Sequence, residues 1–152
     1  MARLGLCCTF RDAPIKFRTT TARYVSTLAR AARPRFLNEL AMHNADALAQ
    51  AITWCAGHGI GAFRVNSGVL PMYTHPTVGW KLDSATGRGV AAALQRAGAL
   101  ARAAEIRLSF HPDQFVVPGS LTPRVVDASL TELEYMGEVA TLIGAEQLTI
   151  HG

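Results

Sequence analysis

Four short apolar segments, separated by stretches with helical periodicity, constrain the fold of this chain more than any other feature. The segments are residues 3–8, 62–67, 106–111 and 147–152. Each is brief and mostly apolar, as expected for strands buried on both faces of a parallel sheet. Because these strands alternate with helices, we expect right-handed crossover connections and an α/β fold.

The stretch between the first two strands predicts one regular helix and a less regular N-terminal region. Asn44 is expected to cap a helix that ends at Gly57. Its apolar face is expected to comprise Leu48, Ile52 and Cys55. Upstream, the threonines at 19–21 can begin a helix that Pro34 would end.

Two further helices are predicted in the second half of the chain. One covers residues 89–104, where apolar side chains recur at helical spacing. The other is expected to begin with Thr122 as its cap and Pro123 at its first position, and to end at Gly144. Its apolar face is expected to comprise Val126, Leu130, Leu133 and Val139.

The spacing of the predicted strands also indicates the size of the complete fold. Strands that start at residues 62, 106 and 147 give roughly forty residues for each strand–helix unit, so an eight-stranded parallel barrel would need about 300 residues. The chain has 152 residues, of which 49% are apolar and 17% charged, and this composition excludes intrinsic disorder. We therefore expect residues 1–152 to form one domain of about four strand–helix units, an incomplete barrel.

Neither a membrane span nor an export signal is expected. The sequence has no run of 18 apolar residues, and Arg11 and Asp12 interrupt the N-terminal segment before a signal-peptide core can form. The three cysteines, Cys7, Cys8 and Cys55, have the spacing of neither a disulfide framework nor a zinc site. We therefore expect a cytoplasmic protein with three buried, reduced thiols, and infer no obligate protein partner.

Basic side chains are concentrated near the N-terminus. Residues 1–38 contain eight basic side chains and one acidic side chain, a net charge of +7, whereas residues 39–152 carry −3. Clustered Lys and Arg side chains favour polyanions because they displace counterions from phosphates. Lys16, Arg18 and Arg23, which stand among threonines, are therefore candidates for contacts with a DNA backbone. The alternative is that this basic run is a solvated surface.

Three of the five histidines stand at or after the ends of predicted strands. His111 and His151 end their strands, and His75 lies in the loop after the second strand. The carboxyl ends of parallel strands gather at one face, and neutral imidazole is a common metal ligand, so this placement predicts a metal site. The alternative is three separate rings, each bonded to a neighbouring backbone group. His43 and His58 are expected to pair with carbonyl groups or solvent.

The loop after the third predicted strand carries an amide and an aromatic ring next to a candidate metal ligand. Gln114 and Phe115 follow His111 closely, and Pro112 and Pro118 restrict the loop. A rigid loop that presents a ring suits insertion into a base stack, where the ring replaces lost stacking. The alternative is that Phe115 packs beneath the loop.

Two polar side chains, Arg64 and Asn66, are predicted at the carboxyl end of the second strand. We expect both to point toward the same face as the candidate metal ligands. They either bind the substrate directly or orient the ligands of the metal through hydrogen bonds.

Several ordered segments of the sequence resemble the UV damage endonuclease family. The likeness covers nearly the whole chain, and THPTVGW together with HPDQF is its most specific part. The matching segments are RLGLCCTFRDAPIKFRTTTARY, GIGAFRVNSGVLPMYTHPTVGW, IRLSFHPDQFVVPGS, LTELEYMGEVATLIGA and LTIHG. The resemblance implies a TIM barrel with a cluster of divalent metals, manganese expected, in its mouth. It also implies an endonuclease that nicks UV-damaged double-stranded DNA on the 5′ side of pyrimidine dimers and so starts excision repair.

The resemblance also assigns roles to individual residues. His75, His111 and His151 match metal-binding histidines of the family, and Gln114 and Phe115 match the pair that probes the lesion from within the duplex. Many family members have Tyr at the second of these positions, so Phe115 keeps the ring and lacks the hydroxyl. The remaining ligands of the family belong to the second half of the barrel, so we expect residues 1–152 to be inactive alone.

Two other hypotheses stay open at the level of the sequence. A sugar isomerase or epimerase could use the same barrel face and metal, and would have a small closed pocket without salt-dependent affinity for DNA. Alternatively, the chain as given is a non-catalytic fragment. The endonuclease hypothesis is supported by the three placed histidines, the basic N-terminal segment and the family resemblance.

Overall fold

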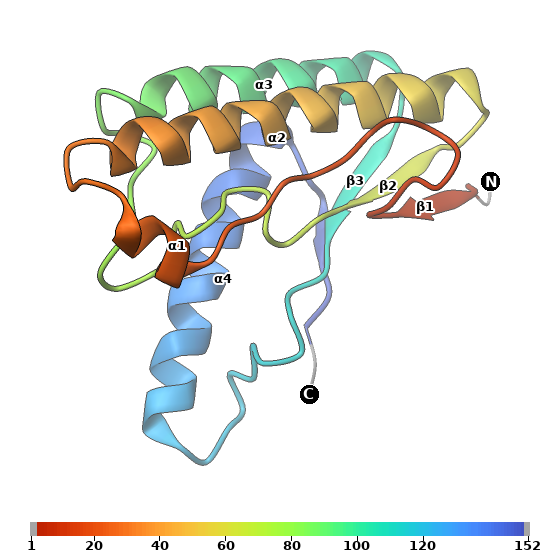
Figure 1. Cartoon of the computed structure of the whole chain (residues 1–152). Helices are drawn as coiled ribbons and strands as arrows, with labels where there is room; N and C mark the ends of the chain where they lie inside the picture. Colours follow the sequence, from red (N-terminus) through yellow and green to blue (C-terminus); the bar gives the residue numbers. More distant parts are fainter. Residues whose placement is uncertain (1–2, 151–152) are drawn as a thin grey trace.

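A computed structural model of the chain describes residues 3–150, which form a parallel sheet with helices packed against it (Figure 1). In chain order the elements are β1 (Gly5–Cys7), α1 (Ala22–Thr27), α2 (Arg33–Gly57), β2 (Ala62–Val65), α3 (Gly87–Ala103), β3 (Arg107–Phe110), α4 (Pro123–Ile143) and β4 (Gln147–Leu148). The strands lie in the order β1-β2-β3-β4, each parallel to the next. Strands that are consecutive and adjacent, with helices between them, are typical of a (β/α) barrel, so the predicted partial TIM-barrel-like fold is confirmed.

The sheet has one buried face and one more open face. In β2, Phe63 and Val65 are buried against the helices, whereas Arg64 between them is only half-buried. In β3, Leu108 and Phe110 repeat this alternation. The prediction that these strands are buried on both faces is therefore wrong for the described part of the chain, because the helices cover the face that carries Phe63.

Helix α2 is longer than the sequence pattern predicts. It begins at Arg33, with Pro34 in its first turn, where the fixed φ of proline suits a helix and its missing N–H is not needed. The prediction that Pro34 ends a helix is therefore wrong. Asn44, the predicted cap, lies in the middle of α2 and is fully buried. Its polar side chain hydrogen-bonds to distant backbone groups of the chain and does not mark a helix start.

The short helix α1 precedes α2 and begins at the threonine run, as predicted. The side chain of Thr21 accepts a hydrogen bond from the Tyr24 N–H at 3.2 Å and so caps the helix. After six residues α1 ends, well before Pro34. Its one buried side chain, Val25, packs with Val78, which joins α1 to the loop after β2.

Helices α3 and α4 begin and end close to their predicted positions. Gly144 follows α4 with a left-handed φ of 71°, a conformation that glycine adopts without steric cost. The buried face of α4 differs from the prediction, because Leu130 is 48% exposed and Ser129 is buried. The two helices approach closely at Gly98, where a Cβ atom would collide with the carbonyl oxygen of Ile143.

One apolar core fills the space between the sheet and the helices. Its largest fully buried side chains include Phe63, Phe110, Leu48, Ile52, Leu94, Leu108, Met136 and Ile143. Within residues 3–150, no helix is long and apolar enough to cross a membrane. The core thus anchors the carboxyl ends of β2 and β3, where the predicted site residues lie.

Candidate functional site at the strand ends

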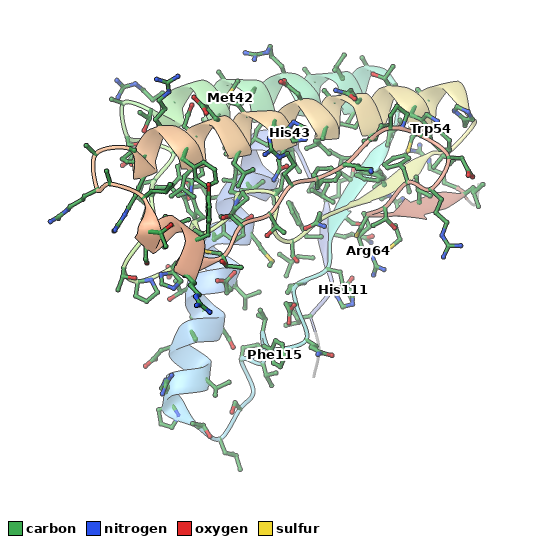
Figure 2. The ribbon with its side chains drawn as sticks, viewed as in Figure 1. Met42, His43, Trp54, Arg64, His111 and Phe115 are labelled. Carbon is green, nitrogen blue, oxygen red and sulfur yellow. The ribbon has the colours of Figure 1, made fainter. Side chains whose placement is uncertain are left out.

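The loops after β2 and β3 carry most of the predicted site residues. Figure 2 shows His111 where β3 ends and Phe115 farther along the loop that follows it. The loop after β2 spans residues 66–86 and contains His75, and the loop after β3 spans residues 111–122. Because β2 and β3 are adjacent and parallel, both loops leave the sheet at the same edge.

His111 follows β3 directly, and its ring is oriented by the neighbouring chain segment. Its Nδ1 lies 3.1 Å from the carbonyl oxygen of Thr149, which can only accept a hydrogen bond. The proton of the neutral imidazole is therefore on Nδ1, and Nε2 carries the lone pair with which histidine binds metals. His111 fits the role of a metal ligand.

His75 is held in the opposite tautomer. The backbone N–H groups of Thr77 and Val78 donate to its Nδ1 at 3.3 and 3.4 Å. The proton of the neutral ring is therefore on Nε2, and this nitrogen does not offer a lone pair to a metal in the observed conformation. Metal binding through Nε2 of His75 requires the ring to give up these two contacts.

The three predicted metal ligands are thus in three different situations. His111 has a suitable tautomer, His75 has the unsuitable one, and His151 lies outside the described residues. Within residues 3–150, no three His, Cys, Asp or Glu side chains are grouped so that they could hold a metal ion.

The loop after β2 is tied to α2 by Asn44, a role that the sequence pattern did not reveal. The Asn44 Oδ1 accepts from the Arg18 N–H at 2.7 Å, and its amide donates to the carbonyl oxygens of Arg18 and Val69 at 2.9 and 3.0 Å. A signal was present in the sequence, because Asn44 stands four residues from both Leu40 and Leu48, on the apolar face of the helix.

Two tyrosines hold the same loop against α4. The Tyr135 hydroxyl donates to the Ser67 carbonyl at 2.9 Å and accepts from the Leu70 N–H at 3.2 Å. The Tyr73 hydroxyl donates to Glu138 Oε2 at 2.7 Å. Burial raises the pKa of Tyr73 to about 12, with Glu138 acting in the same direction, and burial also raises the pKa of Tyr135. Both phenols therefore stay protonated and keep these hydrogen bonds at neutral pH.

A hollow of about 580 Å³ lies between this loop and α4. Its wall includes His75, Thr131 and Glu132, and the Thr74 hydroxyl donates to the Glu132 carboxylate. The hollow does not include His111 or Phe115 in its wall. His75 and His111 therefore belong to different local environments of the described chain, although both follow adjacent strands.

The loop after β3 presents its aromatic ring to solvent. The Phe115 and Val116 N–H groups donate to the side chain and the backbone carbonyl of Asp113, at 3.1 and 2.9 Å. This tight turn buries Val116 and leaves Phe115 77% exposed, with Gln114 exposed beside it. Of the two alternatives for Phe115, exposure is therefore the one observed.

Lys16 and Arg18 lie on the segment that runs alongside α2 (Figure 1), and Arg23 lies in α1. The side chains of Lys16, Arg18 and Arg23 are exposed. Helix α2 holds the backbone of this segment, because His43 Nε2 donates to the Lys16 carbonyl at 2.9 Å. Figure 2 shows His43 on α2 beside the segment. His58 Nδ1 likewise donates to the Trp54 carbonyl at 2.7 Å. Both histidines thus pair with carbonyl groups, as predicted.

Arg64 and Asn66 both have partners within the protein. Arg64 Nε and Nη2 donate to Cys7 Sγ at 3.0 and 2.6 Å, and Asn66 Oδ1 accepts from the Gly68 N–H at 2.8 Å in the turn after β2. The prediction of buried thiols holds for Cys55 and is wrong for Cys7, which is exposed, and for Cys8, which is half-buried. Cys7 is exposed because it shares the open face of the sheet with Arg64.

Known proteins resemble this chain over most of its length. The family model of UV-endonuclease UvdE matches residues 2–151. The UV DNA damage endonuclease of Nostoc sp. is 30% identical over 98% of this chain and 47% of its own length. That of Deinococcus radiodurans is 30% identical over 99% of this chain and 50% of its own length.

The crystal structure of SacUVDE has the same fold in the matched part. It has a TM-score of 0.83 and 26% sequence identity, and the match covers 99% of this chain and 49% of that structure. The chain thus spans about half the length of the relatives that it matches. Because the family model covers nearly every residue, the chain belongs to the UV-endonuclease UvdE family.

Proposed function

We propose that this chain acts in the repair of UV-damaged DNA and that the loop after β3 probes the duplex for lesions. The observation that carries the proposal is the 77% exposure of Phe115 on a turn braced by Asp113, beside exposed Gln114 and close in sequence to His111. The relatives named UV DNA damage endonuclease support it further. They favour this function over that of a sugar isomerase.

The chemistry of damaged DNA explains how such a loop selects its target. Inserting a ring into a base stack costs the stacking energy of the bases that it separates. At a lesion the stack is already weakened, so the same insertion costs less there. Phe115 supplies new stacking area, and the Gln114 amide can form hydrogen bonds with base edges exposed by the insertion.

The N-terminal segment is proposed to contact the DNA backbone. Lys16, Arg18 and Arg23 have exposed side chains, and His43 and Asn44 hold the backbone of the first two in place. Three phosphate contacts of this kind give affinity without sequence preference and weaken it as salt rises. This property suits an enzyme that must find lesions in any sequence.

Cleavage is proposed to depend on divalent metal ions, with manganese the expected ion and the 5′ side of pyrimidine dimers the expected position of the nick. Clustered divalent ions would activate a water molecule and stabilise the departing oxygen. His111 fits a ligand, since Thr149 sets its tautomer, and His151 is its proposed companion. His75 would join them only after release from the N–H groups of Thr77 and Val78.

A binding experiment tests the lesion probe. Fluorescence anisotropy of a UV-irradiated duplex and of the same duplex without irradiation gives the preference for damage. Phe115→Ala is expected to weaken binding to the irradiated duplex about tenfold, since stacking on one base contributes about 1–3 kcal/mol. Leu121→Ala is the matched control, because Leu121 is a fully exposed apolar residue of the same loop. Equal losses in both variants would contradict a specific role for Phe115.

A nicking experiment tests the chemistry separately. UV-irradiated plasmid is incubated with the chain in Mn²⁺ or in EDTA, alongside plasmid without irradiation. Manganese-dependent nicking of irradiated plasmid that His111→Ala abolishes supports the cleavage proposal and overturns the expectation that residues 1–152 are inactive alone. Equal nicking of undamaged plasmid contradicts the proposal. Lesion-selective binding without nicking assigns recognition to this chain and cleavage to ligands beyond it.

A further inference from the structure

Two adjacent cysteines at the end of β1 have a geometry that the proposed endonuclease site does not use. Side chains of successive strand residues normally point to opposite faces of the sheet. Here Cys8 has a φ of 56°, in the left-handed region that non-glycine residues rarely adopt, and its Sγ lies 3.6 Å from that of Cys7. The two sulfur atoms are therefore in contact, with Cys7 exposed and Cys8 half-buried.

Arg64 favours the negatively charged form of the outer thiol, Cys7. Cys7 and Arg64 are paired in the parallel register of β1 and β2, so their side chains leave the same face of the sheet. The guanidinium donates twice to Cys7 Sγ, at 3.0 and 2.6 Å. Because a guanidinium is always charged, these bonds stabilise the thiolate, and Arg64 accordingly lowers the pKa of Cys7.

The surroundings of the inner thiol, Cys8, favour its protonated form. Burial raises the pKa of Cys8 to about 11, and the neighbouring Cys7 sulfur acts in the same direction. The pair thus combines an exposed thiol whose reactive thiolate form Arg64 favours with a half-buried thiol whose pKa is raised, and the two sulfur atoms are in contact. Cys55 provides the contrast, since it is buried in the core and its pKa is also raised by burial.

We propose that Cys7 and Cys8 form a redox site that hydroperoxides oxidise to a vicinal disulfide. The Cys7 thiolate attacks one oxygen of hydrogen peroxide, the O–O bond breaks, and hydroxide leaves and takes up a proton to form water. Cys7 is then a sulfenic acid. The Cys8 sulfur attacks the Cys7 sulfur, and its proton leaves with the displaced hydroxide as a second water. The two cysteines lose two electrons in total, and the peroxide gains them.

The reaction changes the surroundings of Arg64. Oxidation converts the thiolate form of Cys7, which accepts two hydrogen bonds from Arg64, into a neutral disulfide sulfur and so removes a negative charge from the open face of the sheet. Arg64 is itself at the carboxyl end of β2, beside the turn formed by Asn66 and Gly68. Oxidation therefore alters the charge next to the candidate site, although the redox proposal stands independently of the endonuclease function.

Competitive alkylation tests the reactivity of Cys7. The chain is treated briefly with iodoacetamide at pH 7, and tryptic peptides are quantified by mass spectrometry, with residues 4–11 carrying Cys7 and Cys8. Cys7 is expected to react at least about tenfold faster than Cys55 and faster than the thiol of glutathione. Arg64→Gln is expected to lower the Cys7 rate about tenfold, whereas Arg107→Gln, which removes an exposed arginine of β3, leaves the rate unchanged.

Peroxide treatment tests the second step. After hydrogen peroxide, the peptide of residues 4–11 is expected to lose two hydrogen atoms and regain them with dithiothreitol. In Cys8→Ser the reaction stops at the sulfenic acid, which dimedone traps. The proposal is overturned if Cys7 in the unaltered chain reacts no faster than Cys55, or if Cys8→Ser gives no trapped sulfenic acid. These two readouts hold even where Arg64→Gln fails to fold, which circular dichroism would reveal.

Discussion

The loop of residues 66–86 and the loop of residues 111–122 leave adjacent strands at the same edge of the sheet, yet they are held differently. The first is fastened to α2 by Asn44 and to α4 by Tyr135 and Tyr73. The second is braced by its own turn at residue 113, and it exposes a phenylalanine and a leucine. The difference separates a loop whose side chains stabilise the fold from one whose side chains are presented outward.

This contrast has a physical basis in the hydrogen bonds of each loop. The first loop satisfies its buried backbone groups with side chains from distant helices, so it depends on the assembled core. The second closes a turn through Asp113, whose oxygens accept from the N–H groups two and three residues later, and the Val117 N–H donation to Ser129 Oγ at 2.9 Å joins it to α4. Substitutions in the two loops should therefore divide into those that change stability and those that change recognition.

The largest expected effect comes from Asn44→Ala. One buried backbone group of Val69 and two partly buried groups of Arg18 lose their partner, and each unsatisfied group costs about 1–3 kcal/mol, so we expect a loss of roughly 3 kcal/mol in the free energy of unfolding. Urea denaturation followed by circular dichroism measures it. Gln50→Ala, on the exposed side of α2, is the control and should change the free energy by less than about 0.5 kcal/mol. A loss below about 1 kcal/mol for Asn44→Ala would remove the basis of the comparison.

Tyr135→Phe is expected to have the next largest effect. It removes one hydroxyl that serves both the Ser67 carbonyl and the Leu70 N–H, at a cost of about 2 kcal/mol in the free energy of unfolding. Tyr24→Phe, at a half-exposed position on α1, should leave the urea midpoint unchanged. Equal midpoints for both variants would show that α4 does not hold the first loop.

Alkaline pH should loosen the same loop through Tyr73. Its pKa is about 12 in the folded chain against an ordinary value of 10.0, so the protonated phenol is favoured by folding. The stability is fully present below pH 10 and is lost as the pH rises toward 12. The urea midpoint is expected to fall between about pH 10 and about pH 12, and to fall less in Tyr73→Phe. An identical fall in that variant would contradict the assignment.

The smallest expected effect on stability is that of Phe115→Ala. With 77% of its surface exposed, Phe115 contributes little to folding, and its loss should change the free energy of unfolding by less than about 0.5 kcal/mol. Val116→Ala, one residue along and buried, should lose about 2 kcal/mol. A stability loss for Phe115→Ala comparable to that of Val116→Ala would place the ring in the core and end the distinction between the loops.

The sheet could be predicted from the sequence because its strands are short apolar runs whose spacing is independent of tertiary detail. The start of α2 could not, since Pro34 suits either the first turn of a helix or its end. Asn44 led to a predicted helix start that is too late, because an asparagine in a sequence is compatible both with a helix cap and with a buried position inside a helix. Only contact with residues 18 and 69 distinguishes the two.

The loops that carry the candidate residues could be predicted from the sequence, and the contacts of their side chains could not. Strand order puts His75, His111 and Phe115 in loops at one edge, and the exposed ring agrees with the sequence interpretation. The tautomers of the two histidines depend on carbonyl and N–H groups that sequence spacing does not locate, such as that of Thr149. The bond from Arg64 to Cys7 likewise depends on the register between β1 and β2.

Asn44 also has a consequence for the order in which the chain folds. Its hydrogen bonds join segments 26 and 25 residues away in opposite directions, so both intervening stretches must close before the bonds form. We therefore expect these hydrogen bonds to form after the folding transition state. Loss of Asn44 should therefore accelerate unfolding and leave the refolding rate nearly unchanged. Asn44 is therefore expected to slow the detachment of the N-terminal segment from α2, and in Asn44→Ala that segment should detach first during unfolding.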